Sequence, residues 1–213
     1  MTPNRGRFIT LEGGEGAGKT TQIKKLKALL EKKGIDVLLT REPGGSDGAE
    51  LIRNLLVNGD VDRWDPMTEA LLHFAARQDH VEKIIKPALE KGIWVISDRF
   101  ADSTMAYQGY GHGLGADRMS ALYDLVLGDF APDLTVILDL DVETGLKRAL
   151  SRSGGEDRYE RMDISFHQRL REGFLAIAGK EPDRCIILDA NRSEDVVFEV
   201  LSDVMTGKFP DLV

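Results

Sequence analysis

Five short apolar runs recur along the chain, at Phe8–Leu11, Val37–Thr40, Ile93–Ser97, Leu134–Leu140 and Arg184–Asp189. Three of them are β-branched and nearly continuous, rather than alternating between apolar and polar residues. Continuous runs of this kind are typical of strands that are buried on both faces of a parallel sheet. The pattern therefore predicts a parallel sheet built from these runs.

Helical periodicity fills the intervals between the runs. At 21–33, Ile23, Leu26, Leu29 and Leu30 recur at the spacing that lines one face of a helix, and Gly34 ends the pattern. Similar patterns occur at 71–89, 121–125, 142–150, 164–177 and 196–205. Since strands and helices alternate, we expect an α/β doubly wound fold, with the parallel sheet between two layers of helices. Ligands bind to such sheets at the carboxyl ends of the strands.

Composition narrows the class of protein. A chain of 213 residues without an internal repeat or a linker predicts a single domain over residues 1–213. The net charge is −8 and no basic stripe is present, so we expect no nucleic-acid partner. No apolar run reaches membrane-spanning length, and the first residues lack the apolar core of a signal peptide. The single cysteine, Cys185, fits a reducing compartment, and we expect a cytoplasmic protein that does not bind membranes.

A phosphate-binding loop follows the first predicted strand. Residues Gly13, Gly14, Glu15, Gly16, Ala17, Gly18, Lys19 and Thr20 match the pattern G-x-x-x-x-G-K-[ST], and Thr21 leads on into the first predicted helix. In such loops the backbone N–H groups surround phosphate oxygens, the lysine reaches the β- and γ-phosphates, and the hydroxyl can bind Mg²⁺. The motif predicts binding of a nucleoside triphosphate and leaves the reaction open.

Charged residues follow two further predicted strands. Asp98 can bind Mg²⁺ or its water shell, and the guanidinium group of Arg99 can form bidentate hydrogen bonds with a second phosphate. The alternative for this pair is a salt bridge at the end of a strand. The turn at 41–45 also reaches the carboxyl edge of the sheet, where Arg41 or Glu42 could face a substrate.

A polar, glycine-bearing segment at 151–163 is the candidate mobile lid. It carries Arg152, Arg158 and Arg161, and Arg148 precedes it by one helical turn. Arginines that close over a phosphoryl group stabilise its charge and exclude water. Acidic residues of the segment nearly balance these charges, so a solvated face is the alternative interpretation.

These motifs together resemble one family, the bacterial thymidylate kinases, which are nucleoside monophosphate kinases. The matching segments extend over nearly the whole chain, at 12–21, 40–45, 74–77, 98–99, 103–109, 127–130, 132–133, 138–139 and 157–160. The turn Arg-Glu-Pro-Gly-Gly together with Asp-Arg and Ala-Tyr-Gln-Gly is highly specific for this family. The resemblance implies the P-loop nucleotide kinase fold, ATP as the phosphoryl donor, Mg²⁺ as a cofactor, dTMP as the acceptor, and a homodimer.

The resemblance also implies roles for residues around the phosphates and the sugar. Residues Gly13 to Thr21 would hold the ATP phosphates, with Thr20 and Asp98 near Mg²⁺. Arg99 and Arg53 would hold the acceptor phosphate. Glu15 would contact the 3′-hydroxyl of the deoxyribose, and Tyr107 would crowd the 2′ position. The loop at 190–192 would hold adenine.

The base would be read by residues of the helical segments. By resemblance, Arg77 hydrogen-bonds to thymine, Thr104 and Gln108 lie at the other edge of the base, and Glu42 belongs to the substrate pocket. Where the family usually has a stacking phenylalanine, this chain has His73. Imidazole stacks more weakly, and its protonation would make binding depend on pH. Alternatively, Phe74 shifts into that role.

Some relatives carry a catalytic arginine inside the phosphate-binding loop, but here none lies between Gly14 and Gly18. The catalytic arginine would then come from the lid, with Arg158 as the first choice and Arg152 as the second. Lys19, Asp98 and Arg99 complete the expected catalytic set.

The expected reaction transfers the γ-phosphoryl group of ATP to dTMP and gives dTDP and ADP, a step of dTTP synthesis. One alternative is a kinase for another nucleoside monophosphate. A second is a nucleotide-switch protein that hydrolyses GTP, although the chain lacks the guanine-specifying N-K-x-D pattern. A nucleotide-binding protein without turnover is the third.

Overall fold

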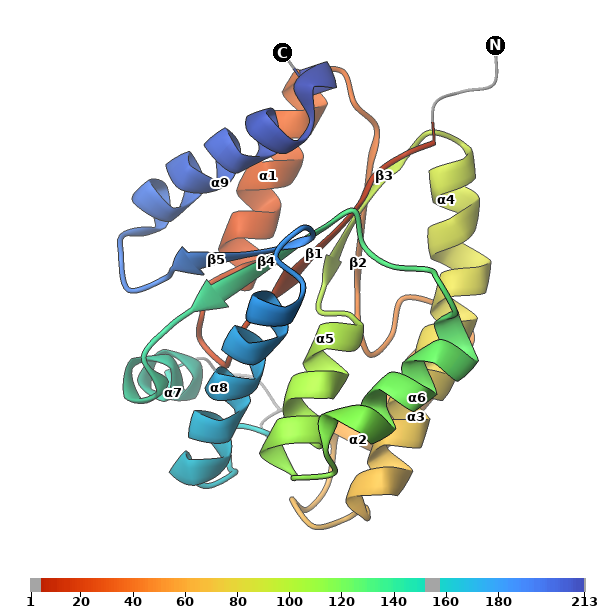
Figure 1. Cartoon of the computed structure of the whole chain (residues 1–213), viewed down its shortest axis with the longest axis vertical. Helices are drawn as coiled ribbons and strands as arrows, with labels where there is room; N and C mark the ends of the chain where they lie inside the picture. Colours follow the sequence, from red (N-terminus) through yellow and green to blue (C-terminus); the bar gives the residue numbers. More distant parts are fainter. Residues whose placement is uncertain (1–4, 152–157, 213) are drawn as a thin grey trace.

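All predicted strands form, and all of them pair in parallel. The computed structural model describes residues 5–151 and 158–212. Its five-stranded sheet has the order β2-β3-β1-β4-β5. The strands are β1 (Phe8–Glu12), β2 (Val37–Arg41), β3 (Trp94–Asp98), β4 (Leu134–Asp139) and β5 (Cys185–Asp189). Helices lie on both faces of the sheet (Figure 1), so the predicted α/β doubly wound fold is confirmed.

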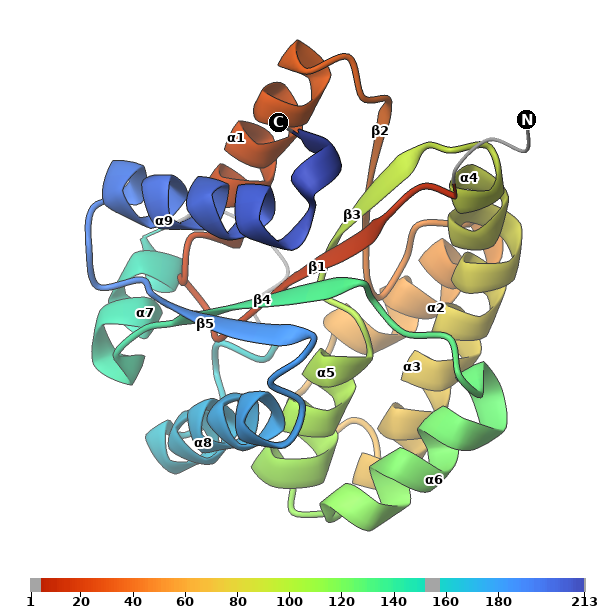
Figure 2. The same cartoon turned by 45° about the horizontal axis from the view of Figure 1, so that its top comes forward.

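The helices divide unequally between the two faces. Helices α1 (Lys19–Lys32) and α9 (Glu194–Lys208) cover one face. The other face carries α3 (Pro66–His80), α4 (Lys86–Glu90), α6 (Ala116–Leu127) and α8 (Ile164–Lys180), and α7 (Val142–Leu150) lies beside the end of β4 (Figure 2). Among the described residues, no helix has both the length and the apolar content that a membrane span requires.

Two helical segments were not predicted. Helix α2 (Asp47–Val57) begins at Ser46, whose side chain accepts a hydrogen bond from the Ala49 N–H group. Helix α5 (Ala101–Thr104) continues into a π-helical stretch, η2 (Met105–Gly111), in a sequence rich in small and polar residues. The predicted segment 71–89 begins earlier, at Pro66, and reaches α4 through a second π-helical stretch, η1 (Val81–Ile85). A short 3₁₀ turn, η3 (Pro210–Leu212), follows α9.

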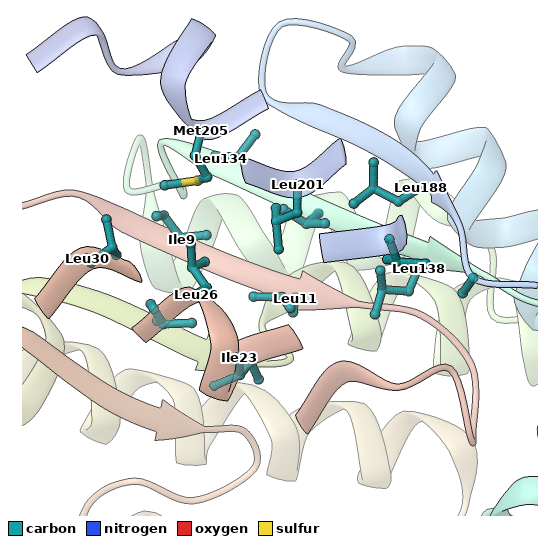
Figure 3. Packing of buried hydrophobic residues seen from close by; sticks show 14 of the residues in the cluster. Ile9, Leu11, Ile23, Leu26, Leu30, Leu134, Leu138, Leu188, Leu201 and Met205 are labelled. Atoms are coloured by element: carbon teal, nitrogen blue, oxygen red, sulfur yellow. The ribbon is translucent and has the colours of Figure 1, made fainter. Parts of the chain in front are cut away.

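The largest apolar core lies between the sheet and the pair α1 and α9. Leu26 and Leu30 of α1 and Leu201 and Met205 of α9 pack around Ile9 of β1 and its neighbours (Figure 3). These side chains are completely buried. Burial of a leucine or isoleucine side chain contributes roughly 1.5–3 kcal/mol, so this core fixes β1 and α1 on either side of the phosphate-binding loop.

The carboxyl ends of the strands lie along one edge of the sheet. Arg41 pairs with Asp98, and Asp139 pairs with Asp189, so the last residues of these strands are in register. Glu12 ends β1 between them. The edge that the fold predicts for ligands is therefore lined with charged residues.

Candidate active site

A cavity of about 240 Å³ opens at this edge, next to the phosphate-binding loop. It brings together most of the residues that the sequence predicted for the site. They are Glu15, Gly16, Ala17, Gly18, Lys19, Thr20, Glu42, Arg53, His73, Arg77, Asp98, Arg99, Thr104, Tyr107 and Gln108. Gly13 and Gly14 line a smaller space behind the loop.

The phosphate-binding loop has the backbone that its glycines predict. Gly13, Gly16 and Gly18 have φ values of 131°, 67° and 90°, in the region that favours glycine. Lys19 bends back over the loop, and its Nζ donates to the carbonyl oxygens of Gly13 (3.1 Å) and Gly14 (3.0 Å). Burial, and next the Arg99 charge, lower the pKa of Lys19 to about 8. A phosphate would relieve both effects, because it supplies negative charge at the buried ammonium group.

Arg99 joins the loop to the rest of the cavity. Its Nη2 donates to Glu15 Oε1 at 3.0 Å, and its Nη1 donates to Gly13 O and Ser103 Oγ. Its backbone has φ 69°, the one positive φ at a non-glycine position among the described residues. The Arg99 N–H donates to Leu11 O, and its carbonyl accepts from Ser97 Oγ, so both backbone groups are fixed. A strained residue held by its surroundings is typical of a functional position.

Glu15 is ionised at neutral pH. Burial alone would raise the pKa of its carboxyl group, but Arg99 and Lys19 lower that pKa to about 2. The Tyr107 hydroxyl donates a hydrogen bond to the same Oε1 that accepts from Arg99. The carboxylate thus stands at the cavity wall between a guanidinium group and a phenol.

Arg77 is held from several sides. Its Nε donates to Glu42 Oε2 at 2.7 Å, and its Nη2 donates to Thr104 Oγ1 at 2.9 Å and to the Phe100 carbonyl at 3.1 Å. Glu42 Oε1 lies 2.9 Å from Nδ1 of His80, which is completely buried. Glu42 lines the cavity as predicted, and it also orients Arg77. The sequence alone did not point to His80, because its partner Glu42 lies 38 residues away.

Two buried polar atoms of the cavity have no partner among the described residues. They are Nη1 of Arg77 and Oε1 of Gln108. The Gln108 Nε2 donates to Glu69 Oε1 at 2.7 Å. The residues that line the cavity therefore keep one buried donor and one buried acceptor for a ligand.

His73, rather than Phe74, lines the cavity. Its Nε2 lies 3.1 Å from the Tyr159 hydroxyl. Burial, and next the charge of Arg77, lower the pKa of His73 to about 3, so the ring is neutral at physiological pH. The Phe74 ring instead lies against Arg77, with the guanidinium carbon 4.8 Å from the ring centre. The expectation that His73 protonation makes binding depend on pH is not supported.

Arg158 does not face the cavity, contrary to expectation. It is 1% exposed and forms an ion pair with Glu69. Its guanidinium nitrogens also donate to the carbonyl oxygens of Leu56, in the last turn of α2, and of Asp60 and Val61, in the connection between α2 and α3. With its donors used in this way, Arg158 anchors the end of the predicted lid. The second choice, Arg152, and the lid residues up to 157 lie outside the described residues.

Thr20 and Asp98 fit a divalent cation. Thr20 lies at the start of α1 and is exposed, Asp98 is the last residue of β3, and both line the same cavity. A hydroxyl and a carboxylate are oxygen donors of the kind that Mg²⁺ prefers, next to a loop that binds phosphate. Among residues 5–151 and 158–212, no cluster of three or more His, Cys, Asp and Glu side chains could hold a metal by itself.

A second cavity of about 280 Å³ lies on the other side of the phosphate-binding loop. Arg148 and Arg192 line it together with Gly16 and Gly18. It includes Ala190, from the loop that the sequence assigned to adenine. Arg148 was predicted only as part of the basic segment, and it reaches the loop because α7 touches Gly16.

Glu12 is a buried acid behind the site that the sequence did not single out. It accepts hydrogen bonds from the Phe100 N–H group (2.7 Å) and Ser103 Oγ (2.5 Å). Burial, and next the nearby Asp102 carboxyl group, raise the pKa of Glu12 to about 8. Glu12 thus holds the segment that carries Arg99.

Comparison with known proteins agrees with this geometry. Residues 11–200 match the family model described as thymidylate kinase. A thymidylate kinase of Caulobacter vibrioides is 55% identical over 204 residues, covering 96% of this chain and 98% of the relative. One of Bradyrhizobium sp. (strain ORS 278) is 51% identical over 205 residues, covering 95% and 91%. The crystal structure of thymidylate kinase from Ehrlichia chaffeensis superposes with a TM-score of 0.74 at 40% identity, covering 94% of this chain and 99% of that one. The chain belongs to the thymidylate kinase family.

Proposed function

We propose that this protein transfers the γ-phosphoryl group of ATP to dTMP, giving dTDP and ADP. The observation that carries the proposal is that one cavity joins a phosphate-binding loop to an unpartnered donor and acceptor, on Arg77 and Gln108. Thymine offers O4 as an acceptor and N3–H as a donor to that pair. The family membership supports the same substrates.

On the donor side, the loop at 13–20 would surround the ATP phosphates, and Lys19 would exchange its contacts with Gly13 and Gly14 for phosphate oxygens. Thr20 and Asp98 would hold Mg²⁺, which neutralises charge on the β- and γ-phosphates when bound. The cavity lined by Arg148 and Arg192 is the place that remains for adenine.

On the acceptor side, Arg99 and Arg53 would bind the 5′-phosphate of dTMP. Arg53 Nη1 donates to the Pro43 carbonyl at 2.7 Å, so its guanidinium group is already oriented at the cavity wall. Glu15 would accept from the 3′-hydroxyl, and Tyr107 would crowd a 2′-hydroxyl. His73 would lie against the base.

The chemistry needs positioning and positive charge rather than a covalent intermediate, because the acceptor already carries a nucleophilic phosphate oxygen. Arg99 and Lys19 supply charge from the described part of the chain. We assign the further charge from the lid to Arg152, because Arg158 is engaged with Glu69 and three carbonyl groups.

The experiment is an ATP-consumption assay with a panel of nucleoside monophosphates and Mg²⁺. We expect dTMP to give the highest kcat/KM and turnover without an acceptor to be negligible. A higher kcat/KM for another monophosphate would show that dTMP is not the natural acceptor. Slow hydrolysis of the nucleoside triphosphate at a rate that no acceptor changes would indicate a nucleotide-switch protein instead of a kinase.

We also propose that the protein is a cytoplasmic homodimer. Leu51 and Leu55 of α2, Leu71 of α3 and Leu125 of α6 are large apolar side chains that are 40–81% exposed. Helix α3 packs against both α2 and α6, so these leucines belong to neighbouring helices. Apolar side chains gathered on neighbouring surface helices favour a protein partner, and a second copy of this chain fits the family expectation.

A further inference from the structure

We propose that Glu69 determines which way the Gln108 amide faces, and that it thereby makes the site accept a pyrimidine with O4 and N3–H and reject one with an N4 amino group. The inference rests on the proposed function, because it requires that Arg77 and Gln108 contact the base. Glu69 would then be a positioning residue for base specificity.

Glu69 is buried in α3, with 1% of its surface exposed. Its Oε1 accepts from Nε2 of Gln108 at 2.7 Å. A carboxylate has no hydrogen to donate, so only the NH₂ side of the amide can face Glu69. The oxygen is what remains for the cavity, and Gln108 Oε1 is indeed the buried atom without a partner among the described residues. An amide turned by 180° would have almost the same shape and would present its N–H groups instead.

The other unpartnered polar atom among the residues that line the cavity is a donor. Arg77 Nη1 is buried and unpartnered, while the other nitrogens of Arg77 donate to Glu42, Thr104 and the Phe100 carbonyl. A donor beside an acceptor matches thymine or uracil. Cytosine presents an amino donor at position 4 and an acceptor at N3, so it would leave both protein atoms facing groups of their own kind. Unpaired polar groups in a buried site give large discrimination between substrates.

Arg158 keeps the Glu69 side chain a hydrogen-bond acceptor. The Arg158 guanidinium group forms an ion pair with Glu69 Oε2 and consists only of donors. His112 Nε2 lies 3.6 Å from Oε1, and the Tyr159 hydroxyl also contacts the carboxylate. A hydroxyl can donate or accept, so it adapts to either arrangement, whereas Arg158 requires an acceptor.

This arrangement makes the substitution Glu69→Gln informative. The new amide would turn its oxygen toward Arg158 and its NH₂ group toward Gln108. Gln108 would then accept with its oxygen and present its own NH₂ group to the base. Gln108 would then present a hydrogen-bond donor to the base in place of an acceptor, while the shape of the cavity stays the same.

The test is kcat/KM for dTMP, dUMP and dCMP with ATP, in the natural protein and in Glu69→Gln. We expect the preference for dTMP over dCMP to fall by about 10-fold or more. The preference for dTMP over dUMP should not change, because thymine and uracil present the same edge to Arg77 and Gln108. An equal loss for all three substrates would mean that Glu69 is merely structural and would overturn the proposal.

Two further variants keep the test decisive. In Glu69→Gln combined with Arg158→Met, the constraint from Arg158 is gone, so part of the dTMP preference should return. If Glu69→Gln does not fold by circular dichroism, Gln108→Ala carries the test, since loss of the acceptor should lower the dTMP/dCMP ratio. An unchanged ratio there would overturn the inference. If the natural protein itself does not phosphorylate dTMP, the proposed function is wrong, which is a different outcome from failure of the inference about Glu69.

Discussion

Single residues at the site divide into those that a local motif predicts and those that only the fold reveals. Lys19 follows from a motif at fixed spacing, Arg99 from its position after a predicted strand, and Arg77 from the resemblance to a family. Glu12 and Glu69 do not, because their partners Phe100 and Gln108 lie 88 and 39 residues away. A buried acid leaves no periodic signal in the sequence, so the residues that orient the site had to come from the structure.

The low pKa of His73 predicts a loss of stability in acid. The unfolded ring has an ordinary pKa of 6.5 and the folded ring about 3, so the unfolded chain binds more protons as the pH falls below 6.5. His73→Phe removes this penalty. The stability of the variant relative to the natural protein should therefore rise by about 1.4 kcal/mol for each pH unit below that value. Urea unfolding at pH 7.5, 6 and 5 measures it, and a difference that is constant with pH would contradict it.

The anchoring role of Arg158 predicts a large effect on stability. Arg158→Met leaves the buried Glu69 without its ionic partner, which should lower the free energy of unfolding by about 3–5 kcal/mol. Thermal unfolding measures this loss. The double variant with Glu69→Met should recover most of it, since the buried charge is then absent too. Lys24→Met, on the exposed side of α1, is the matched control, with an expected change within about 0.5 kcal/mol.

At the scale of elements, strands and long amphipathic helices were predicted well, and irregular helices were not. Helix α2 buries Ala49, Leu56 and Val57, but it is short and follows a glycine-rich turn. The π-helical stretch η2 contains Gly109 and Gly111, which argue against a helix in any local interpretation. In the structure Gly111 is required, because a Cβ there would lie 2.6 Å from the Phe166 ring of α8. Packing against α8 thus overrides propensity.

A contact between two backbones ties α7 to the phosphate-binding loop. A Cβ added to Gly145 of α7 would lie 2.5 Å from the Glu15 carbonyl oxygen. Gly145→Ala should therefore destabilise the protein by roughly 1–3 kcal/mol and raise KM for ATP, although alanine normally favours a helix. In Gly179→Ala, within α8, the new Cβ meets nothing within 4 Å, and the substitution should stabilise by about 0.5–1 kcal/mol. Thermal unfolding measures the stability of both variants, and steady-state kinetics measure their KM for ATP. A stabilising effect of Gly145→Ala would contradict the close contact.

For the whole molecule, the alternation of strands and helices predicted the class of fold and the edge at which the site lies. The strand order β2-β3-β1-β4-β5 could not be predicted, because it depends on contacts between segments far apart in the chain. The same holds for the surface that α2, α3 and α6 share. The exposed leucines come from three separate helices, and only the fold shows that these helices are neighbours.

This surface predicts how the protein associates. Leu125 of α6 is 81% exposed, and Leu125→Arg places a charge where we expect a second copy to pack. Sedimentation should give a dimer for the natural protein and a monomer for the variant. Val200→Arg, on α9 across the sheet, should remain dimeric. A natural protein that sediments as a monomer, or a Leu125→Arg dimer, would reject this interface.

The buried Glu12 has a consequence for calorimetry. Because the pKa of Glu12 is about 8 in the folded protein, its carboxyl group is mostly protonated at pH 7, and it ionises when the chain unfolds. Unfolding then releases a proton to the buffer from this group. The heat of unfolding at pH 7 should accordingly differ between phosphate and Tris, which take up protons with different enthalpies, and Glu12→Gln should reduce that difference. The end of β1 thus exchanges a proton with the solvent each time the protein folds.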